Sequence, residues 1–142
     1  MNDHCVFCRI VAGTIPGVKV YEDEHVLAFM DIYPITKGHT LVIPKAHHNP
    51  ITDMPLPLLQ KVIAVVQNIA KAMVDGLGAD GVNVTQANGE IAGQVIPHVH
   101  FHVIPRLQND PHSWTSPQRK YDNDKEIGEY AAAIRKNVKD PG

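Results

Sequence analysis

The sequence predicts an α+β protein with a mainly antiparallel sheet, one long helix, a short N-terminal helix and a C-terminal helix. Short apolar runs bounded by turn residues lie on both sides of residues 52–75, where apolar residues instead recur at helical spacing. The chain has 142 residues, of which 44% are hydrophobic and 20% are charged. This size and composition suit one globular domain over residues 1–142.

Before residue 52 the pattern predicts one short helix and three strands. Residues 6–12 form the expected helix, which Gly13 ends. A polar turn follows the first strand, and the dipeptide Lys37-Gly38 turns the chain into the third. The strands are expected at residues 18–22, 26–32 and 39–43.

The long helix is expected to run from about residue 53 to about Asp75. Thr52 or Asp53 can cap its start, and prolines at positions 55 and 57 are tolerated only near that start. Gly76 and Gly78 are expected to stop it. One face carries an apolar stripe that should pack on the sheet: Leu58, Val62, Val65, Ile69 and Met73.

After the long helix the sequence predicts two more strands and a last helix. The strands are expected at residues 82–86 and 95–104, joined by a glycine-bearing loop. Residues 108–123 are polar and contain prolines, which predicts an irregular segment. Asp124 is expected to cap the last helix, whose apolar stripe comprises Ile127, Tyr130, Ala131, Ile134 and Val138.

Charge and hydropathy narrow the possible function classes. A formal net charge of -2 and an aromatic content of 6% give little support for a nucleic-acid-binding module. No run reaches the roughly 18 apolar residues of a membrane span, and the first residues lack the pattern of a secretory signal. We therefore expect a cytoplasmic protein with neither a membrane nor a nucleic-acid partner.

Three histidines that alternate with apolar residues are the most informative feature of the chain. They are His98, His100 and His102, in the stretch His-Val-His-Phe-His-Val-Ile. In an extended strand, successive side chains point to opposite faces, so the histidines share one face and the apolar residues share the other. Such a row of imidazoles suits either metal binding or chemistry on an anion. A purely structural role and a metal-only site are the alternatives.

The loop before the histidines has features of a phosphate site. Gly93 lets a ligand approach the backbone, and the N–H groups that follow it can face an anion. Gln94 adds a side-chain amide donor. Because most glycine-bearing turns are only turns, this signal is weak without its neighbours.

The two cysteines, Cys5 and Cys8, form a Cys-x-x-Cys motif. In a chain without an export signal, this motif indicates metal binding or redox chemistry rather than a structural disulfide. Two distant histidines could complete a tetrahedral Cys2His2 zinc site.

Taken together, three stretches resemble the histidine triad family. The histidine row matches the family pattern His-x-His-x-His-x-x, in which x is apolar. Residues 29–32 and 39–45 match the other landmarks of the family at familiar spacing, and residues 5–10 match its opening. The resemblance covers about residues 5–106 and implies the α+β fold of that family, with residues 107–142 as a C-terminal extension.

The resemblance implies a nucleotide hydrolase that cleaves at the α-phosphate and releases a nucleoside monophosphate. His100 corresponds to the nucleophile that forms a covalent nucleotidyl-imidazole, which water then cleaves. The backbone around His102 would hold its tautomer. His102 and His39 correspond to imidazoles that flank the phosphate, and Gln94 and the N–H of Val95 correspond to phosphate contacts.

The remaining nucleotide-binding residues are also assigned by resemblance. Asp31 corresponds to the ribose ligand, and Asn88 and Gly93 lie in the phosphate loop. The slot for a purine base is assigned to four apolar residues: Phe7, Ile10, Phe29 and Ile32.

Two positions depart from the family pattern. Val95 stands where the phosphoramidase branch often has a serine that assists the leaving group. Ala87 stands where many relatives carry a second amide residue. The choice between nucleoside phosphoramidates and dinucleoside polyphosphates as substrates therefore stays open.

Some relatives hold zinc at positions that correspond to Cys5, Cys8, His47 and His98. A closed site of this kind would be structural, and the chemistry would need no metal. His48 competes with His47 as the ligand, because adjacent residues cannot be separated by sequence alone.

Two rival functions use the same residues. A nucleotidyl transferase would pass the group on His100 to a phosphate instead of water, and a zinc-stabilised adaptor would bind the nucleotide with incidental turnover. The resemblance also implies a homodimer, built by the helix near 55–75 and the strand 82–86 as a sheet edge. The region around Trp114 could then reach the partner's active site.

Overall fold

A five-stranded antiparallel sheet is the centre of the fold. The structure, a computed structural model, describes residues 3–110 and 119–139, so the prediction for the region around Trp114 lies outside the described residues. The strand order is β1-β2-β3-β5-β4. The elements are α1 (Val6–Ala12), β1 (Lys19–Glu22), β2 (Val26–Met30), β3 (Thr40–Pro44), α2 (Leu56–Leu77), β4 (Gly81–Gln86), β5 (Phe101–Arg106) and α3 (Asp124–Asn137). The predicted α+β class with a long helix, an N-terminal helix and a C-terminal helix is confirmed.

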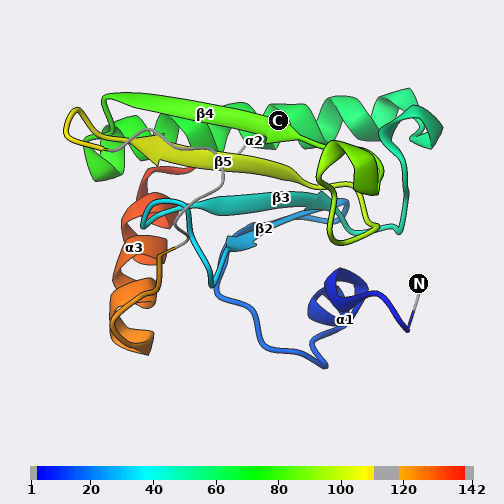
Figure 1. Ribbon diagram of the computed structural model, residues 1–142, viewed down its shortest axis with the longest axis horizontal. Coiled ribbons are helices and arrows are strands. Elements are labelled where there is room, and N and C mark those ends of the chain that lie inside the picture. The colour runs from blue at the N-terminus through cyan, green and yellow to red at the C-terminus, as the bar shows by residue number, and fades with distance from the viewer. Residues whose placement is uncertain (1–2, 111–118, 140–142) are drawn as a thin grey trace.

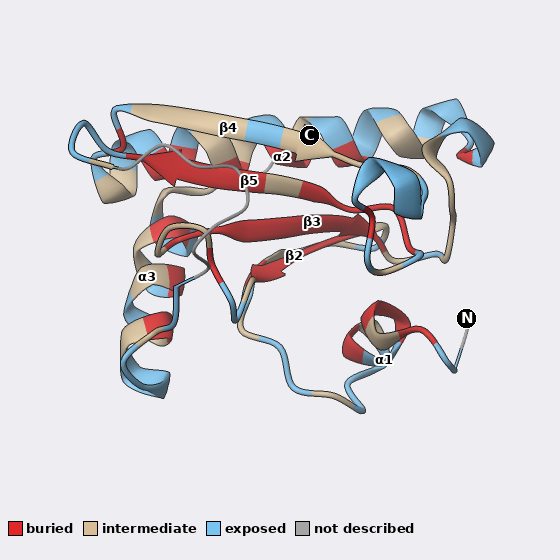
Figure 2. Ribbon diagram, in the orientation of Figure 1, coloured by how far each residue is buried: buried red, intermediate tan, exposed pale blue. Residues whose placement is uncertain are grey.

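Helices cover the two faces of the sheet unequally (Figure 1). The long helix α2 lies along β5 and β3 and contacts α3, and together they close the larger core cluster. The short helix α1 lies on the opposite side, over a smaller cluster that includes Phe7, Leu27 and Phe29. The central strands β2, β3 and β5 are almost wholly buried, whereas the edge strand β4 is half-buried (Figure 2).

The register of the sheet brings three strands together at His102. Leu41 on β3 lies opposite His102 on β5, and Thr85 on β4 lies opposite it on the other side. The start of β5, where His102 lies, is therefore flanked by β3 and β4.

The structure corrects how the long helix begins and ends. Thr52 and Asp53 do not cap it, because residues 51–53 form a separate 3-10 turn and Pro55 occupies the cap position without a side-chain hydrogen bond. Gly76 does not stop the helix, which ends one residue beyond it at Leu77, with Gly78 left-handed at φ 66°. A Cβ at Gly76 would lie 2.5 Å from the carbonyl oxygen of Ala133, so this glycine permits close contact with α3.

The cap of the last helix also differs from the prediction. Asn123, not Asp124, precedes α3, and its side chain accepts a hydrogen bond from the N–H of Glu126. Three residues of the predicted stripe are buried, namely Ile127, Ala131 and Ile134. The described helices include none that is long and apolar enough to cross a membrane.

The histidine strand is shorter than predicted. It begins at Phe101 instead of residue 95, because the chain bends at residues 96–98 around Pro97. The alternation nevertheless holds: Val99, Phe101 and Val103 belong to the larger core cluster. Similarly, the strand predicted over 26–32 ends at Met30, and residues 90–92 of the glycine loop form a 3-10 turn.

Candidate active site and metal centre

A cavity of about 880 Å³ opens beside the histidine row. It is lined by α1, by the chain that follows β2, by the glycine loop and by β5. The predicted site residues that line it are Phe7, Ile10, Phe29, Asp31, Ile32, His39, Gly93, Val95, His100 and His102. Its volume is in the range of small-molecule sites.

The surroundings of His100 fix which of its nitrogens is free. Its Nδ1 lies 2.6 Å from the carbonyl oxygen of His98, and a carbonyl can only accept a hydrogen bond. In neutral His100, Nδ1 therefore carries the proton and Nε2 keeps its lone pair. The carbonyl that holds this tautomer belongs to His98, which corrects the expectation that the backbone around His102 would do so. Burial lowers the pKa of His100, which favours the neutral ring.

Phe7 packs its ring edge-on against His100. The two ring centroids are 5.0 Å apart at an interplanar angle of 80°. The same ring contacts Phe29 at 5.4 Å. Helix α1 therefore supplies both a wall of the cavity and a support for the histidine.

His39 and His102 form a directed hydrogen-bonded pair. The N–H of Ile35 donates to His39 Nδ1 at 3.0 Å, so the proton of the neutral ring is on Nε2. That Nε2–H donates to His102 Nδ1 at 2.9 Å, which leaves His102 with its own proton on Nε2. Burial, followed by His102, Arg106 and His100, lowers the pKa of His39 to about 3. Burial and His100 lower the pKa of His102 to about 4.

Asp31 lies at the same end of the cavity. One carboxylate oxygen accepts a hydrogen bond from the N–H of Tyr33 at 2.9 Å, and the other lies 3.6 Å from His39 Nε2. Burial raises the pKa of Asp31. Asp31, His39 and His102 also bring three potential ligand atoms within 4.8 Å of one another. A metal on His39 would have to displace the Nε2 proton that Ile35 fixes there, so the hydrogen-bonded arrangement describes this group better.

Gln94 and Asn88 do not line the cavity. The Gln94 amide accepts from the N–H of Gly89 at 2.7 Å and donates to Asn49 Oδ1 at 2.7 Å. Asn88 Oδ1 accepts from the N–H of Ile51 at 2.8 Å. Both side chains brace the loop that presents Gly93 and Val95, and their contact with a phosphate stays a prediction.

Some residues at the site carry no signal in the sequence. Ile35 acts through its backbone N–H, which no side-chain pattern reveals. Tyr33 and Asp124 line the cavity from segments that the motifs do not include. Thr85 also lines it, and the pairing of residues 82–86 with the histidine strand could have identified it.

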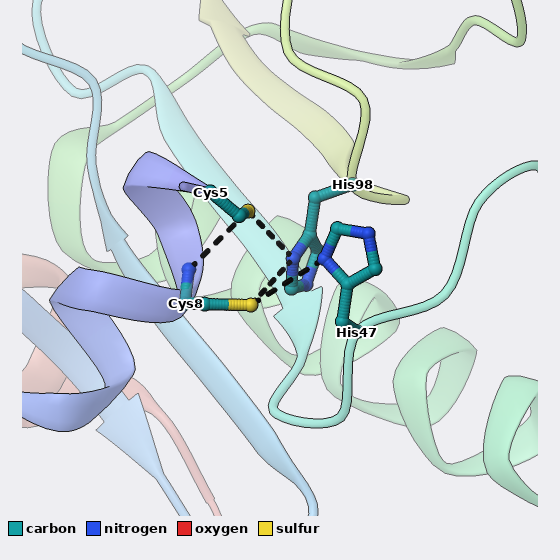
Figure 3. A group of neighbouring side chains, drawn as sticks. All are labelled: Cys5, Cys8, His47 and His98. Carbon is teal, nitrogen blue, oxygen red and sulfur yellow. Dashed lines mark hydrogen bonds between the residues drawn. The ribbon is translucent and has the colours of Figure 1, made fainter. Parts of the chain in front are cut away.

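The four predicted metal ligands lie together at the other end of the row (Figure 3). Ligand atoms of Cys5, Cys8, His47 and His98 all lie within 4.8 Å of one another. Cys5 Sγ is 3.3 Å and Cys8 Sγ is 3.6 Å from His98 Nδ1. His47 Nδ1 is 3.4 Å from Cys8 Sγ. The geometry selects His47 over His48, whose backbone carbonyl is bonded to the N–H of Val99.

This group fits a zinc ion. Zn–S and Zn–N bonds of about 2.3 and 2.0 Å in a tetrahedron place sulfur and nitrogen about 3.5 Å apart, close to the observed separations. His98 Nε2 lies 2.9 Å from the carbonyl oxygen of Pro44 and donates to it, which leaves Nδ1 free for a metal. Burial raises the pKa of the Cys5 thiol, and a bound cation would favour its thiolate.

Comparison with known proteins identifies the family. The HIT domain model matches residues 12–109. The chain belongs to the histidine triad (HIT) family. The matched range ends before α3, so the C-terminal extension lies beyond the family pattern.

The relatives of this HIT protein include characterised enzymes. An uncharacterised HIT-like protein of Methanocaldococcus jannaschii is 50% identical over 106 residues, covering 75% of this chain and 81% of that protein. An adenosine 5'-monophosphoramidase of Schizosaccharomyces pombe is 44% identical over 102 residues, or 72% and 74% of the two chains. An adenylylsulfatase of Arabidopsis thaliana is 35% identical over 141 residues, or 97% and 71%.

Solved structures share the whole fold. A HIT-like protein of Bartonella henselae has a TM-score of 0.85 at 37% identity, covering 97% of this chain and 99% of that one. A zinc-bound histidine triad protein of Mycobacterium smegmatis has a TM-score of 0.82 at 42% identity, covering 93% and 94%.

Proposed function

We propose that this HIT protein is a hydrolase of purine nucleotide derivatives that acts through a covalent nucleotidyl intermediate on His100. The observation that carries the proposal is the free Nε2 of His100, which faces the cavity while Nδ1–H is held by the His98 carbonyl. The enzymatic names of the fission-yeast and plant relatives support a hydrolase that acts on adenylyl compounds.

The reaction would proceed in two displacements at the α-phosphorus. His100 Nε2 forms a bond to phosphorus as the bond to the leaving group breaks, and the leaving group departs with the electron pair. The positive charge on the imidazole is stabilised by the Nδ1–H bond to the His98 carbonyl. Water then attacks phosphorus and gives up a proton to the solvent, the bond to Nε2 breaks with its electron pair returning to the nitrogen, and a nucleoside monophosphate leaves.

The other site residues would bind and orient the nucleotide. The Nε2–H of His102, fixed by the bond from His39, can donate to phosphate oxygens as negative charge develops. The N–H groups after Gly93 can do the same at the other side. Asp31 would accept ribose hydroxyls, and four apolar residues that line the cavity would hold the base: Phe7, Ile10, Phe29 and Ile32.

Zinc on Cys5, Cys8, His47 and His98 would be structural. When bound, it cross-links the N-terminal segment to the histidine row, with no open position for chemistry. The zinc-bound mycobacterial neighbour supports this assignment. His98 would then be a ligand rather than an acid or base.

Two substrate classes, with different leaving groups, remain candidates: nucleoside phosphoramidates and dinucleoside polyphosphates. Val95 is 89% exposed at the cavity and offers only its backbone N–H to a leaving group. The phosphoramidase name of one relative favours nucleoside phosphoramidates, whereas the absence of a serine at this position favours dinucleoside polyphosphates. A single HIT domain over residues 1–142 and a cytoplasmic location also stay predictions.

Hydrolysis of adenosine 5'-phosphoramidate and of diadenosine tetraphosphate, measured side by side, tests the proposal. We expect the wild type to release AMP and His100→Ala to lose at least about 1,000-fold in kcat/KM, because no other group replaces the nucleophile. The faster substrate assigns the leaving-group class.

His25→Ala is the control, because His25 lies outside the cavity and should retain full activity. Equal kcat/KM for AMP release in His100→Ala and the wild type would show that His100 is not the nucleophile. An inert wild type that still binds AMP would favour the adaptor function.

A further inference from the structure

The segment that leads into α3 packs against the loop that precedes His39. Arg119 donates its backbone N–H to the Pro34 carbonyl at 2.7 Å and its side-chain Nε–H to the Ile35 carbonyl at 3.2 Å. The hydroxyl oxygen of Tyr121 accepts the N–H of Gly38 at 2.8 Å. Residues far from the family motifs therefore hold both ends of the loop 34–38.

A salt bridge fixes the same loop from α3. Lys37 Nζ lies 2.9 Å from Glu126 Oε1, and Glu126 Oε1 also accepts the N–H of Asp122 at 2.8 Å. Gly38 has φ 106°, and a Cβ there would lie 2.7 Å from Leu77 Cδ1. This turn therefore requires glycine, and the segment 119–126 bonds to the loop that contains it.

The loop matters because one of its peptide groups sets the tautomer of His39. The Pro34 carbonyl and the Ile35 N–H belong to the same peptide unit and point in opposite directions. Arg119 N–H bonds to one end of that unit, and the other end donates to His39 Nδ1. His39 Nε2–H then donates to His102 Nδ1.

A continuous chain of hydrogen bonds therefore runs from the C-terminal extension to the cavity. Each donor in such a chain polarises the next, so its members strengthen one another. The chain ends at the Nε2–H of His102, the donor that the proposed function directs at phosphate. Without the bond from Ile35, His39 could place its proton on Nδ1. His102 would then donate from Nδ1 to His39 Nε2, and its own Nε2 would face the cavity as an acceptor instead of a donor.

We propose that residues 119–126 act as a clamp in which Arg119 and Tyr121 are positioning residues for the His39–His102 pair. They touch no reacting atom. The backbone N–H of Arg119 bonds to the Pro34–Ile35 peptide unit itself, whereas the Arg119 side chain and Tyr121 hold that unit in place through the neighbouring peptide groups at Ile35 and Gly38. The catalytic consequence rests on the proposed hydrolase function, whereas the effect on the His39 tautomer does not. The clamp lies outside residues 12–109, the range of the family pattern.

Two variants test the clamp without removing a cavity residue. Tyr121→Phe deletes one oxygen atom, with Tyr130→Phe as its control, since the Tyr130 ring contacts Tyr121 at 5.9 Å but bonds to no described residue of the loop. Arg119→Ala removes the bond to Ile35, with the exposed Lys120→Ala as its control. The second pair serves if Tyr121→Phe does not fold.

The first readout is the tautomer of His39, measured by long-range ¹H–¹⁵N NMR on labelled protein. We expect the wild type and both controls to show the Nε2–H form alone, and the two clamp variants to show a mixture with the Nδ1–H form. The second readout is turnover, for which we expect kcat to fall by about five- to tenfold with little change in KM, the loss typical of one hydrogen bond.

Unchanged His39 signals in both clamp variants would overturn the clamp. An equal loss of kcat in Tyr130→Phe would also overturn it, because the effect would then be general packing. If the wild type hydrolyses neither nucleotide, the proposed function fails, while the NMR comparison still decides the clamp.

Discussion

At the scale of single residues, backbone groups decide what each histidine can do. The His98 carbonyl holds a proton on His100 Nδ1, and the Ile35 N–H keeps one off His39 Nδ1. The Pro44 carbonyl holds a proton on His98 Nε2, so the Nδ1 that faces the cysteines is free of one. Three rings of identical chemistry thus differ in which nitrogen carries the proton, which suits the roles proposed for them: nucleophile for His100, hydrogen-bond donor for His39 and metal ligand for His98.

The burial of His39 predicts a loss of stability in mild acid. Its pKa is lowered to about 3 in the folded protein by burial and by His102, Arg106 and His100; among residues 3–110 and 119–139, Asp31 is the one carboxylate within 4 Å of its ring. In the unfolded chain the pKa is about 6.5, so below that pH the unfolded state binds a proton that the folded state does not. Stability is therefore fully present above pH 6.5 and falls as the pH falls.

Urea unfolding at pH 7 and pH 5 measures this effect. Integration over that interval gives about 2 kcal/mol from His39 alone, so His39→Gln should lose that much less stability than the wild type between the two pH values. Ile43→Val is the control, because it weakens the core without removing a titrating group. Equal pH dependence in the wild type and His39→Gln would contradict the prediction.

At the scale of elements, the sequence predicted the type of each helix and strand but not every boundary. Periodicity identified α2 through Val62, Ile69 and Met73, because burial of one face is a long-range signal that repeats. Sequence patterns failed to predict that the helix continues through Gly76, because this glycine is needed for close contact with α3, some sixty residues away. They also failed at the start of β5, because a bend at Pro97 keeps the alternation of side chains while ending the hydrogen bonds of the strand.

The same limit applies to the site. The histidine row and the cysteine pair were recognisable because side chains of special chemistry stand at fixed spacing, and Asp31 was assigned through the resemblance to the family. Ile35, Arg119 and Tyr121 were not, because they act through backbone groups or through a contact that only the folded chain creates.

Helix α1 is the element that should depend most on zinc. It has seven residues; Cys5, one proposed ligand, caps its start, and Cys8, another, lies within it. A helix of this length is not stable alone. We expect elemental analysis to find one zinc per chain. We also expect zinc to raise the free energy of unfolding of the metal-free protein by about 2.7 kcal/mol when the free zinc concentration is a hundred times Kd.

Substitutions at the adjacent residues His47 and His48 test which of the two binds zinc. Cys8→Ser and His47→Ala should abolish stoichiometric zinc, because each removes a ligand atom of the group. His48→Ala should retain zinc, because His48 contributes a backbone carbonyl to Val99. Zinc lost from His48→Ala but kept by His47→Ala would reverse the assignment.

At the scale of the whole molecule, one surface remains apolar. Ile63 and Val74 on α2 are 45% and 49% exposed, and Val84 on the neighbouring edge strand β4 is 47% exposed. The cavity and the metal group lie on the other face of the sheet, beside α1. A second copy that covers α2 and extends the sheet at β4 would bury these residues without closing the cavity.

We therefore expect a homodimer with twofold symmetry, of twice the 15.6 kDa chain mass. Sedimentation equilibrium measures this mass directly. Val84→Lys and Ile63→Lys should shift the population to monomer, because each places a charge in the apolar interface. Thr14→Lys adds the same charge at an exposed position beyond α1 and should leave the dimer intact. A wild type that sediments as a monomer at high concentration would exclude this interface, and the exposed residues of α2 and β4 would then need a different partner.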